Sequence, residues 1–376
     1  MASIGGRVVP GDVCSEILLW LPAKEALRGR SICRAFDVSS HDRTFFLWQS
    51  RRARDDSGLF LRRHDGRFEM VFTDACAGMP PESLQFLKGG NKRILGSHGG
   101  IVIFDTMPAG DPSSTSGFCL YNPVQGELRH IPRPDGASIL SVRTFGVAIL
   151  FADDDAGDHV HRYDVVCMTP TSEWSSNMVC WLYSSKEEAW MLIGDNIYVG
   201  PRNIKFHSPV VSSHGRVIYL ASDCGRYQKQ EPYIVAVDID TGTSKILPLT
   251  EKVLATDGTS GDLEQIEIAA GECGALSVVH CNSASEFTVW EVKDPDMSWV
   301  WEQRGRVSMA AMGLQPRPVH GVSLVNGDVL VFTVNEDVYV HSLKDEVGQV
   351  KVIKGQEGCC PYMCAYANTF RPCEDR

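Results

Sequence analysis

Cysteine can act as a metal ligand, a redox group or a nucleophile, and this chain of 376 residues contains 13 cysteines. Cys359, Cys360, Cys364 and Cys373 gather late in the sequence and could be zinc ligands, and the adjacent pair could be a redox pair. Their spacing matches no standard structural-zinc pattern. Because cysteine is commonly a small buried hydrophobe, the sequence favours a structural role for these side chains.

Two further groups of side chains could hold a cation. The acidic run 153–155 with Asp158 lacks the register and the terminal Glu of a calcium-binding loop, so it is more typical of a solvated turn. His159 and His161 alternate on a candidate strand and would share one face, but no third ligand accompanies them. We therefore expect no metal site and no cofactor.

Nucleotide, sugar and nucleophile chemistry have weak signals. The segment Gly96–Gly100 (GSHGG) lacks the Gly-Lys-Ser/Thr of a phosphate loop and leads into a strand. No local Ser-His-Asp or Cys-His pattern marks a catalytic nucleophile. Tryptophans could form a sugar-stacking platform, but their alternation within a strand favours packing inside a sheet. They are Trp174, Trp181, Trp190, Trp290, Trp299 and Trp301.

The amino-acid composition predicts a folded chain that resides in a reducing compartment. Hydrophobic residues make up 43% and charged residues 22%, enough to bury a core. The odd number of cysteines, the absence of CxxC pairs and the absence of Asn-x-Ser/Thr sites favour the cytoplasm or the nucleus. No apolar run is long enough to span a bilayer, and no basic segment followed by an uncharged hydrophobic stretch opens the chain.

Charge divides the chain in two. Residues 1–64 contain 11 Lys and Arg against 7 Asp and Glu, whereas the remainder contains 25 against 40, within an overall net charge of −11. An acidic bulk repels phosphate backbones, so a general role in nucleic-acid binding is disfavoured. The change near residue 65 also suggests a domain boundary.

The basic part has helical periodicity. Asp12 can cap a helix in which Val13, Ile17 and Leu21 recur on one face, and Pro22 ends it. A second helix is expected from Pro22 onward, with Ala26, Leu27 and Ile32 facing inward. A third is expected through residues 44–48 into the basic stretch 51–54.

Residues 9–53 resemble an F-box over their whole length. The family's pattern is matched in order and spacing, with Val9, Ile32 and Phe36 standing where the family usually has Leu, Val and Trp. Each departure keeps an apolar side chain, although Phe36 could loosen the packing of the third helix. The matching positions are Pro10, Asp12, Glu16, Ile17, Leu18, Leu21, Pro22, Lys24, Leu27, Arg30, Cys33, Arg34 and Phe45.

The resemblance implies a small all-α, three-helix F-box domain over residues 1–55. It also implies docking to a Skp-type adaptor protein, which links such chains to a cullin scaffold. Some of the apolar side chains must face the domain's own core, and the sequence does not sort them. By the family's pattern the adaptor-binding set is Val9, Pro10, Ile17, Leu18, Leu21, Pro22, Leu27, Ile32 and Cys33.

Residues 56–376 are expected to form an all-β domain. Alternating or β-branched runs of four to eight residues recur between Gly, Pro, Asp and Asn, without a convincing helix between them. The runs are Ile101–Phe104, Val147–Phe151, Val217–Leu220, Ile234–Ile239, Leu276–His280, Phe287–Val292, Val329–Val334 and Val338–His341.

These runs fall into a repeat with the length of a propeller blade. Units that begin at Gly99, Gly146, Gly215, Gly274 and Gly327 predict five blades of four strands. Strand-like segments within 59–75 could pair with residues 363–370 to close the ring as a sixth blade, which would remove exposed sheet edges. The alternative architecture, a pair of β-sandwiches, predicts no such repeat.

The β region resembles the Kelch-like F-box-associated domains of the large plant F-box families. The resemblance rests on GSHGG, YNPVQGELRHIP, SSHGRVIYL and VAVDIDTG, and no copy preserves the regular Kelch double-glycine and Tyr/Trp set. We therefore expect a non-catalytic substrate-recognition subunit of an SCF-type cullin ubiquitin ligase, whose propeller binds a target protein of unknown identity. The candidate target-binding loops are 105–117, 152–159, 222–232 and 255–263.

Two other functions stay open. The propeller could bind a glycan or a small ligand, which would make the chain a lectin-like or ligand-gated F-box protein. A Kelch-type propeller enzyme with an accidental helical cap is a further alternative, and it would need ligands that converge on a central channel.

Overall fold

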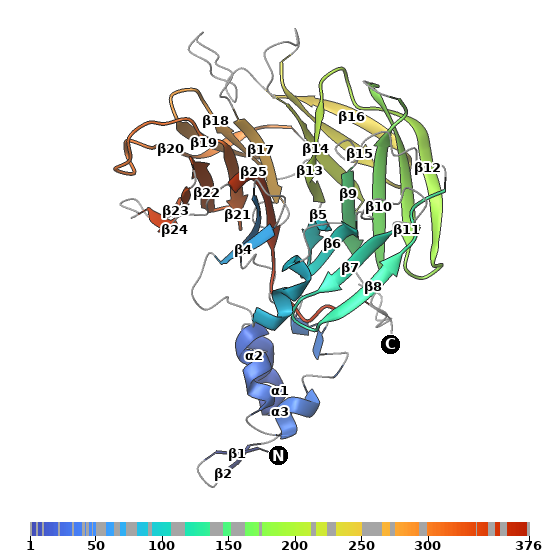
Figure 1. Ribbon diagram of the computed structural model, residues 1–376, viewed down its shortest axis with the longest axis vertical. Coiled ribbons are helices and arrows are strands. Elements are labelled where there is room, and N and C mark those ends of the chain that lie inside the picture. The colour runs from blue at the N-terminus through green and yellow to red at the C-terminus, as the bar shows by residue number, and fades with distance from the viewer. Residues whose placement is uncertain are drawn as a thin grey trace.

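The computed structural model places a ring of β-sheets above a short group of helices (Figure 1). It describes residues 2–4, 7–9, 11–21, 23–31, 34–39, 42, 45–46, 48–49, 58–63, 68–72, 81–88, 92–106, 117–135, 146–151, 162–172, 175–211, 216–223, 231–249, 265–270, 275–292, 299–335, 337–344, 350–353 and 359–373.

The ring is a six-bladed β-propeller. Five sheets have four antiparallel strands each, and the sixth has three in the described part of the chain. The innermost strands of neighbouring blades contact one another all the way round, in the order β5, β9, β13, β17, β21 and β25 and back to β5. The predicted propeller is confirmed, and the alternative of two β-sandwiches is excluded.

Successive strands of a blade run from the centre of the ring outward. Blades 1 to 3 contain β5 (Lys92–His98), β6 (Ile101–Thr106), β7 (Phe118–Asn122) and β8 (Glu127–Ile131); β9 (Gly146–Phe151), β10 (Tyr163–Pro170), β11 (Asn177–Ser184) and β12 (Ala189–Tyr198); and β13 (Ile204–Val211), β14 (Val217–Ser222), β15 (Tyr233–Asp238) and β16 (Thr243–Pro248).

The remaining blades follow the same order. They contain β17 (Gln265–Ala270), β18 (Leu276–Cys281), β19 (Glu286–Val292) and β20 (Glu302–Ser308); β21 (Gly321–Val325), β22 (Val329–Val334), β23 (Asp337–Ser342) and β24 (Lys351–Ile353); and β25 (Cys359–Tyr366), β3 (Gly58–Arg63) and β4 (Phe68–Phe72). The strand-like runs expected from the sequence lie on these strands, apart from Ile239, which follows the end of β15.

The sixth blade closes the ring with strands from both parts of the sequence. Met363 of β25 pairs with Leu61 of β3, and Ala365 pairs with Leu59. Leu61 in turn pairs with Glu69 of β4. This is the closure that the sequence predicted, and it gives the inner edge of β3 a hydrogen-bonded partner.

Turns of the predicted chemistry join the strands. Between β7 and β8, Gly126 has a φ of +70°, which a glycine adopts without strain. The Asn122 side-chain oxygen accepts hydrogen bonds from the backbone N–H groups of Val124, at 2.8 Å, and Gln125, at 3.1 Å. This Asx turn holds a tight reversal at one end of the ring.

The core lies between the blades because each strand has apolar side chains on both faces. Leu120 of blade 1 packs in one cluster with Val165 of blade 2, while Val166 on the opposite face packs with Val235 of blade 3. Burial of both faces explains why the strands of the ring read as nearly continuous apolar runs.

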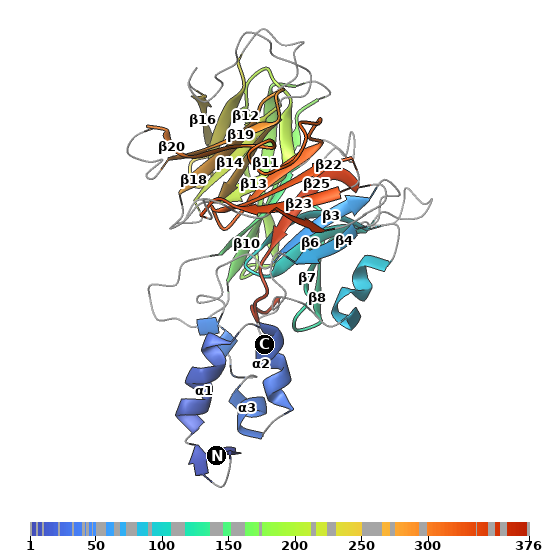
Figure 2. The same cartoon turned by 90° about the vertical axis from the view of Figure 1, so that its left-hand side faces the viewer.

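Helices lie at one side of the ring, as the view turned by 90° also shows (Figure 2). They are α1 (Gly11–Trp20), α2 (Ala23–Arg30) and α3 (Arg34–Ser39), and helical backbone is also present at 45–46 and 48–49. We call these segments the helical unit. The first two helices lie where the sequence predicts them, although α2 ends at Arg30 and Ile32, which was expected to face inward from it, lies outside the described residues. The helical backbone at 45–46 and 48–49 falls on the expected third helix, whereas α3 was not foreseen.

Two smaller elements complete the described chain. A hairpin of β1 (Ala2–Ile4) and β2 (Arg7–Val9) precedes α1, and the 3-10 helix η2 (Pro81–Lys88) lies between β4 and β5. Among the described residues, no helix has the length and the apolar character needed to cross a membrane.

Candidate functional site

The inner side of the helical unit packs against the ring. Leu18 of α1 and Ala26 of α2 are fully buried, and Phe45 is 5% exposed, in a cluster that also contains Val124 and Phe370 of the propeller. Arg30 places its guanidinium 5.2 Å from the centre of the Phe370 ring, and burial lowers the pKa of Arg30, although Asp37 acts in the opposite direction. The helices are therefore joined to the ring through an apolar core.

The outer side of α1 carries an apolar stripe that faces solvent. Val13 and Ile17 are each 46% exposed and Trp20 is 70% exposed, at spacings of four and three residues that place them on one face of a helix. The indole N–H of Trp20 donates to the Glu16 carboxylate at 3.0 Å, so the polar atom of the ring is satisfied within the helix. An exposed row of large apolar side chains is typical of a protein-binding surface.

Two more apolar side chains extend the exposed surface of the helical unit. Val38 on α3 is 63% exposed and Trp48 is 47% exposed. We call Val13, Ile17 and Trp20 the outer stripe.

The structure separates the predicted adaptor-binding residues. Ile17 lies on the outer stripe, whereas Leu18 is buried in the contact with the ring, and Leu21 and Leu27 are partly buried against that same cluster. Val9 lies in strand β2. Five of the predicted residues either lie outside the described residues or have no described side chain. They are Val9, Pro10, Pro22, Ile32 and Cys33.

Val13 and Trp20 were not among the predicted binding residues. The expectation of one apolar face with Val13, Ile17 and Leu21 was incomplete, because α1 has apolar side chains on two sides: one side meets the ring and the other meets solvent. The signal that could have found Trp20 is its place three residues after Ile17 on the face opposite Leu18.

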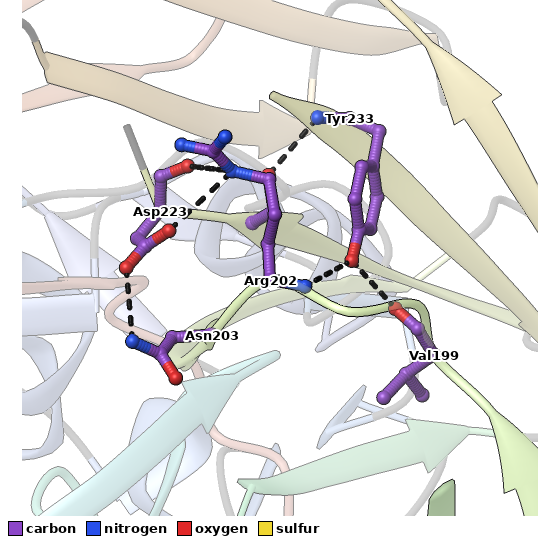
Figure 3. Close-up of polar contacts among 6 residues, drawn as sticks. Val199, Arg202, Asn203, Asp223 and Tyr233 are labelled. Carbon is purple, nitrogen blue, oxygen red and sulfur yellow. Dashed lines mark hydrogen bonds and ion pairs between the residues drawn. The ribbon is translucent and has the colours of Figure 1, made fainter. Parts of the chain in front are cut away.

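A second candidate lies at the opposite end of the ring from the turn at Gly126. In each blade the antiparallel strands send their connections alternately to the two ends, and the β12–β13 connection and the residue after β14 fall at this second end. Here Arg202, whose side chain is only 2% exposed, donates from Nε to the backbone oxygen of Asp223 at 2.9 Å and lies 3.5 Å from its carboxylate (Figure 3).

Tyr233 completes this buried polar group (Figure 3). Its hydroxyl accepts from the backbone N–H of Arg202 at 2.9 Å and donates to the Val199 carbonyl at 3.1 Å. Burial raises the pKa of Tyr233. Gly200 has a φ of +87°, and a Cβ there would lie 2.2 Å from the tyrosine hydroxyl. These contacts fix the connection between blades 2 and 3, so we assign the cluster a structural role.

Burial favours the protonated form of three thiols, those of Cys119, Cys167 and Cys180, and so makes them weak nucleophiles. Burial raises the pKa of Cys167 and of Cys180 to about 12, and it also raises the pKa of Cys119. Cys364 and Cys373, which the sequence singled out, are buried and form no disulfide, as expected for structural cysteines. In the part of the chain that the structure describes, no group of three or more His, Cys, Asp or Glu could hold a metal ion.

Several segments singled out by the sequence lie elsewhere. Gly96–Gly100 forms the end of β5 and the turn into β6, as a strand connection should. Trp181 and Trp290 are buried in the blades, while Trp190, Trp299 and Trp301 are partly exposed. Other candidates lie outside the described residues. They include the acidic run 153–155, Asp158, His159, His161, Trp174, the side chain of Cys360, and most of the four candidate target-binding loops.

Comparisons with known proteins give the chain no family. No protein-family model matches it, and no curated protein matches it. Among solved structures, it is similar to the GH93 alpha-L-arabinofuranosidase of Fusarium graminearum, with 12% identity over 72% of this chain and 82% of that chain and a TM-score of 0.42. It is also similar to the Aleuria aurantia lectin AAL, with 10% identity over 70% of this chain and 78% of that chain and a TM-score of 0.40.

A prolyl endopeptidase is similar over 72% of this chain but only 43% of its own length, with 12% identity and a TM-score of 0.38. The chain therefore spans less than half of that relative. Likeness at this level carries no argument about ligand, substrate or catalysis.

Proposed function

We propose that the chain is a substrate-recognition subunit of an SCF-type cullin ubiquitin ligase. The helical unit would dock to a Skp-type adaptor, and the propeller would hold a target protein. The observation that carries the proposal is the outer stripe, an exposed apolar surface on the segment whose residues resemble an F-box.

The physical case for docking is the exposure of side chains that water solvates poorly. Covering Val13, Ile17 and Trp20 with a partner's helices would remove apolar area from water at roughly 25 cal/mol per Å². An aromatic and two aliphatic side chains on one helical face are also the kind of anchors that groove-binding helices use. The helical unit thus offers a partner a contact that leaves its own packing against the ring intact.

In this function the chain would bring a target protein close to another protein's ubiquitin thioester. A ring that holds a target beside another protein's ubiquitin thioester raises the effective concentration of the target lysine without providing a nucleophile. The net charge of −11 would favour basic or mixed-charge partners through the rate of encounter.

An Ile17→Asp variant of the full chain tests the docking step against a purified Skp-type adaptor. Ile17 is exposed in the free chain, so the fold should survive, while a carboxylate buried at an apolar contact should cost on the order of 2 kcal/mol or more. We expect adaptor affinity measured by calorimetry to fall by about thirty-fold or more.

Met191→Asp is the matched control, because Met191 lies on β12 of the ring with 47% exposure against 46% for Ile17. Its adaptor affinity should equal that of the wild type. Absence of adaptor binding by the wild-type chain, or equal affinity of wild type and Ile17→Asp, would contradict the proposal.

A glycan-binding propeller is the second candidate, and one patch of the ring favours it. Trp299 and Trp301 are partly exposed on either side of Val300, which is 65% exposed, and the Lys245 ammonium lies 5.6 Å from the centre of the Trp299 ring. Partly exposed indole rings can stack on sugar rings, and the buried part of both indoles packs against the core cluster between blades 3 and 4.

Tryptophan fluorescence of wild type and Trp299→Ala during titration with neutral and acidic oligosaccharides tests this candidate. Saturable quenching in the wild type that is lost in Trp299→Ala would support it. An unchanged spectrum with every sugar class would count against it and leave the docking test unaffected.

A further inference from the structure

We propose that residues 367–373, which we call the strap, set the orientation of the helical unit relative to the ring. The strap follows closing strand β25, has no regular secondary structure, and is buried or half-buried throughout. Its atoms contact blade 1, blade 2 and the helical unit at once, so one short segment holds three parts of the molecule together.

Blade 1 binds the backbone of the strap. The Asn122 side-chain amide donates to the carbonyls of Thr369, at 3.0 Å, and Arg371, at 2.5 Å. Gln125 donates to the Phe370 carbonyl. These donors come from the β7–β8 turn, where the Asn122 side-chain oxygen is already used to hold the turn. The strap is therefore fixed by the same residue that shapes the turn.

A second anchor is at the β5–β6 turn. The Thr369 hydroxyl donates to the Gly99 carbonyl at 2.6 Å. Gly100 has a φ of +88°, and a Cβ at that position would lie 2.1 Å from the Thr369 hydroxyl oxygen. The turn and the strap thus approach as closely as a glycine permits.

Blade 2 and the outer strand of blade 1 hold the far end of the strap. The Arg371 guanidinium lies 3.7 Å from the centre of the Phe151 ring. The Cys373 N–H donates to Glu127 at 3.0 Å, and the Tyr163 hydroxyl donates to the Cys373 carbonyl at 3.1 Å. With both ends and the middle bound to the ring, the strap is preorganised to present one side chain.

That side chain is Phe370, which is fully buried among the helices. Its ring lies 5.4 Å from that of Phe45 and 6.2 Å from that of Phe46. Its N–H donates to the Gln49 side-chain oxygen at 3.1 Å, a contact between residues 321 positions apart in the sequence. The propeller thus inserts the aromatic side chain of Phe370 into the inner side of the helical unit, and the hydrogen bond to Gln49 adds a directional contact.

The consequence concerns the outer stripe, which lies on the opposite side of α1 from Leu18. Because Leu18 packs in the cluster around Phe370, the direction in which the stripe points is fixed by the strap. A partner bound to the stripe would be held at one angle to the ring.

Hydrogen–deuterium exchange of the full chain tests the strap in a Phe370→Ala variant. We expect amides of α1 and α2 to exchange about ten-fold faster or more, because the contact that holds them is lost, while amides of the ring keep their wild-type rates. Phe332→Ala is the control: it removes a fully buried aromatic from blade 5 and should leave the helical amides unchanged.

Gln49→Ala provides a second, milder variant that removes one hydrogen bond and keeps the aromatic packing. It should accelerate helical exchange in the same direction to a smaller extent. Unchanged helical protection in both variants would overturn the proposal. Loss of ring protection together with helical protection in Phe370→Ala would also overturn it, since the strap would then belong to the ring core.

The test is separate from that of the proposed function. The strap makes its contacts on the inner side, so Phe370→Ala can loosen the helices whether or not an adaptor binds. Ile17→Asp addresses only the outer stripe and should leave helical exchange in the free chain at wild-type rates.

Discussion

The phenyl ring of Phe46 lies nearly parallel to that of Phe370, with ring centres 6.2 Å apart and planes inclined by 9°. One residue belongs to the helical unit and the other to the strap. Their contact shows that one side of the helices faces the propeller. Neighbouring residues of α1 that are equally apolar in the sequence therefore differ in burial, depending on whether they face the propeller or solvent.

Leu18→Ala and Ile17→Ala should have very different effects on stability. Leu18 is fully buried and Ile17 is 46% exposed. Truncation of a buried leucine leaves a cavity and typically costs about 2–5 kcal/mol, whereas an exposed isoleucine should cost less than about 1 kcal/mol. Chemical denaturation followed by the circular dichroism of the helices measures both. Equal effects would mean that the two sides of α1 are misassigned.

Gly200→Ala should destabilise the ring more than Gly126→Ala. Both glycines have positive φ values, +87° and +70°, so alanine is strained by about 1 kcal/mol at each. A Cβ at Gly200 would also meet the Tyr233 hydroxyl at 2.2 Å, while no atom of the described residues lies within 4 Å of a Cβ at Gly126. Thermal unfolding should give a lower midpoint for the Gly200 variant; equal midpoints would show that Tyr233 yields without cost.

Arg133→Met should be strongly destabilising, because it leaves a buried carboxylate without its guanidinium. Arg133 donates to both oxygens of Asp105, at 2.7 and 2.8 Å, and Asp105 is fully buried. Breaking such a pair costs about 3–5 kcal/mol, whereas replacing both partners by apolar residues can be nearly neutral. Urea denaturation of Arg133→Met and of the double variant with Asp105→Leu tests this; a double variant as unstable as the single would contradict the assignment to an unpaired charge.

Acidification should weaken the fold through His280. This side chain is 3% exposed in blade 4, and burial lowers its pKa below the ordinary value of 6.5. A lowered pKa means that the unfolded chain takes up the proton first, so stability is full above the unfolded pKa and falls as the pH drops below about 6.5.

The His280→Leu variant isolates that contribution. Denaturant midpoints at pH 7.5 and 5.5 should differ less in His280→Leu than in the wild type. If the two proteins lose the same stability between these pH values, protonation of other groups accounts for the acid sensitivity and the prediction for His280 is wrong.

Local patterns explain why so much of the ring could be predicted. The apolar, β-branched composition of runs such as Val329–Val334 predicts buried strands. The segment from Asn122 to Gly126 predicts a turn because its Asn and Gly residues favour turn conformations. The pairing of a strand within 59–75 with residues 363–370 was also foreseeable, because two unmatched strands in a ring must close it. The register that pairs Leu61 with Met363 came from the structure.

Contacts between distant segments were not foreseeable in the same way. Nothing local to Phe370 shows that its side chain enters the helices, and nothing local to Arg202 shows that Asp223 lies beside it. The two sides of α1 are ambiguous for the same reason. Both are apolar, and only the position of the ring decides that Leu18 is inside and Ile17 outside.

The span between Gln49 and Phe370 has a consequence for biosynthesis. At about 5–20 residues per second, a ribosome needs roughly 15 to 60 seconds to make the 321 residues that separate them. Throughout that interval the nascent helices lack the aromatic side chain that fills their inner side, and β3 lacks β25. Folding of the first part of the chain must therefore wait for the last, and chaperones that shield apolar surface have a defined window in which to act.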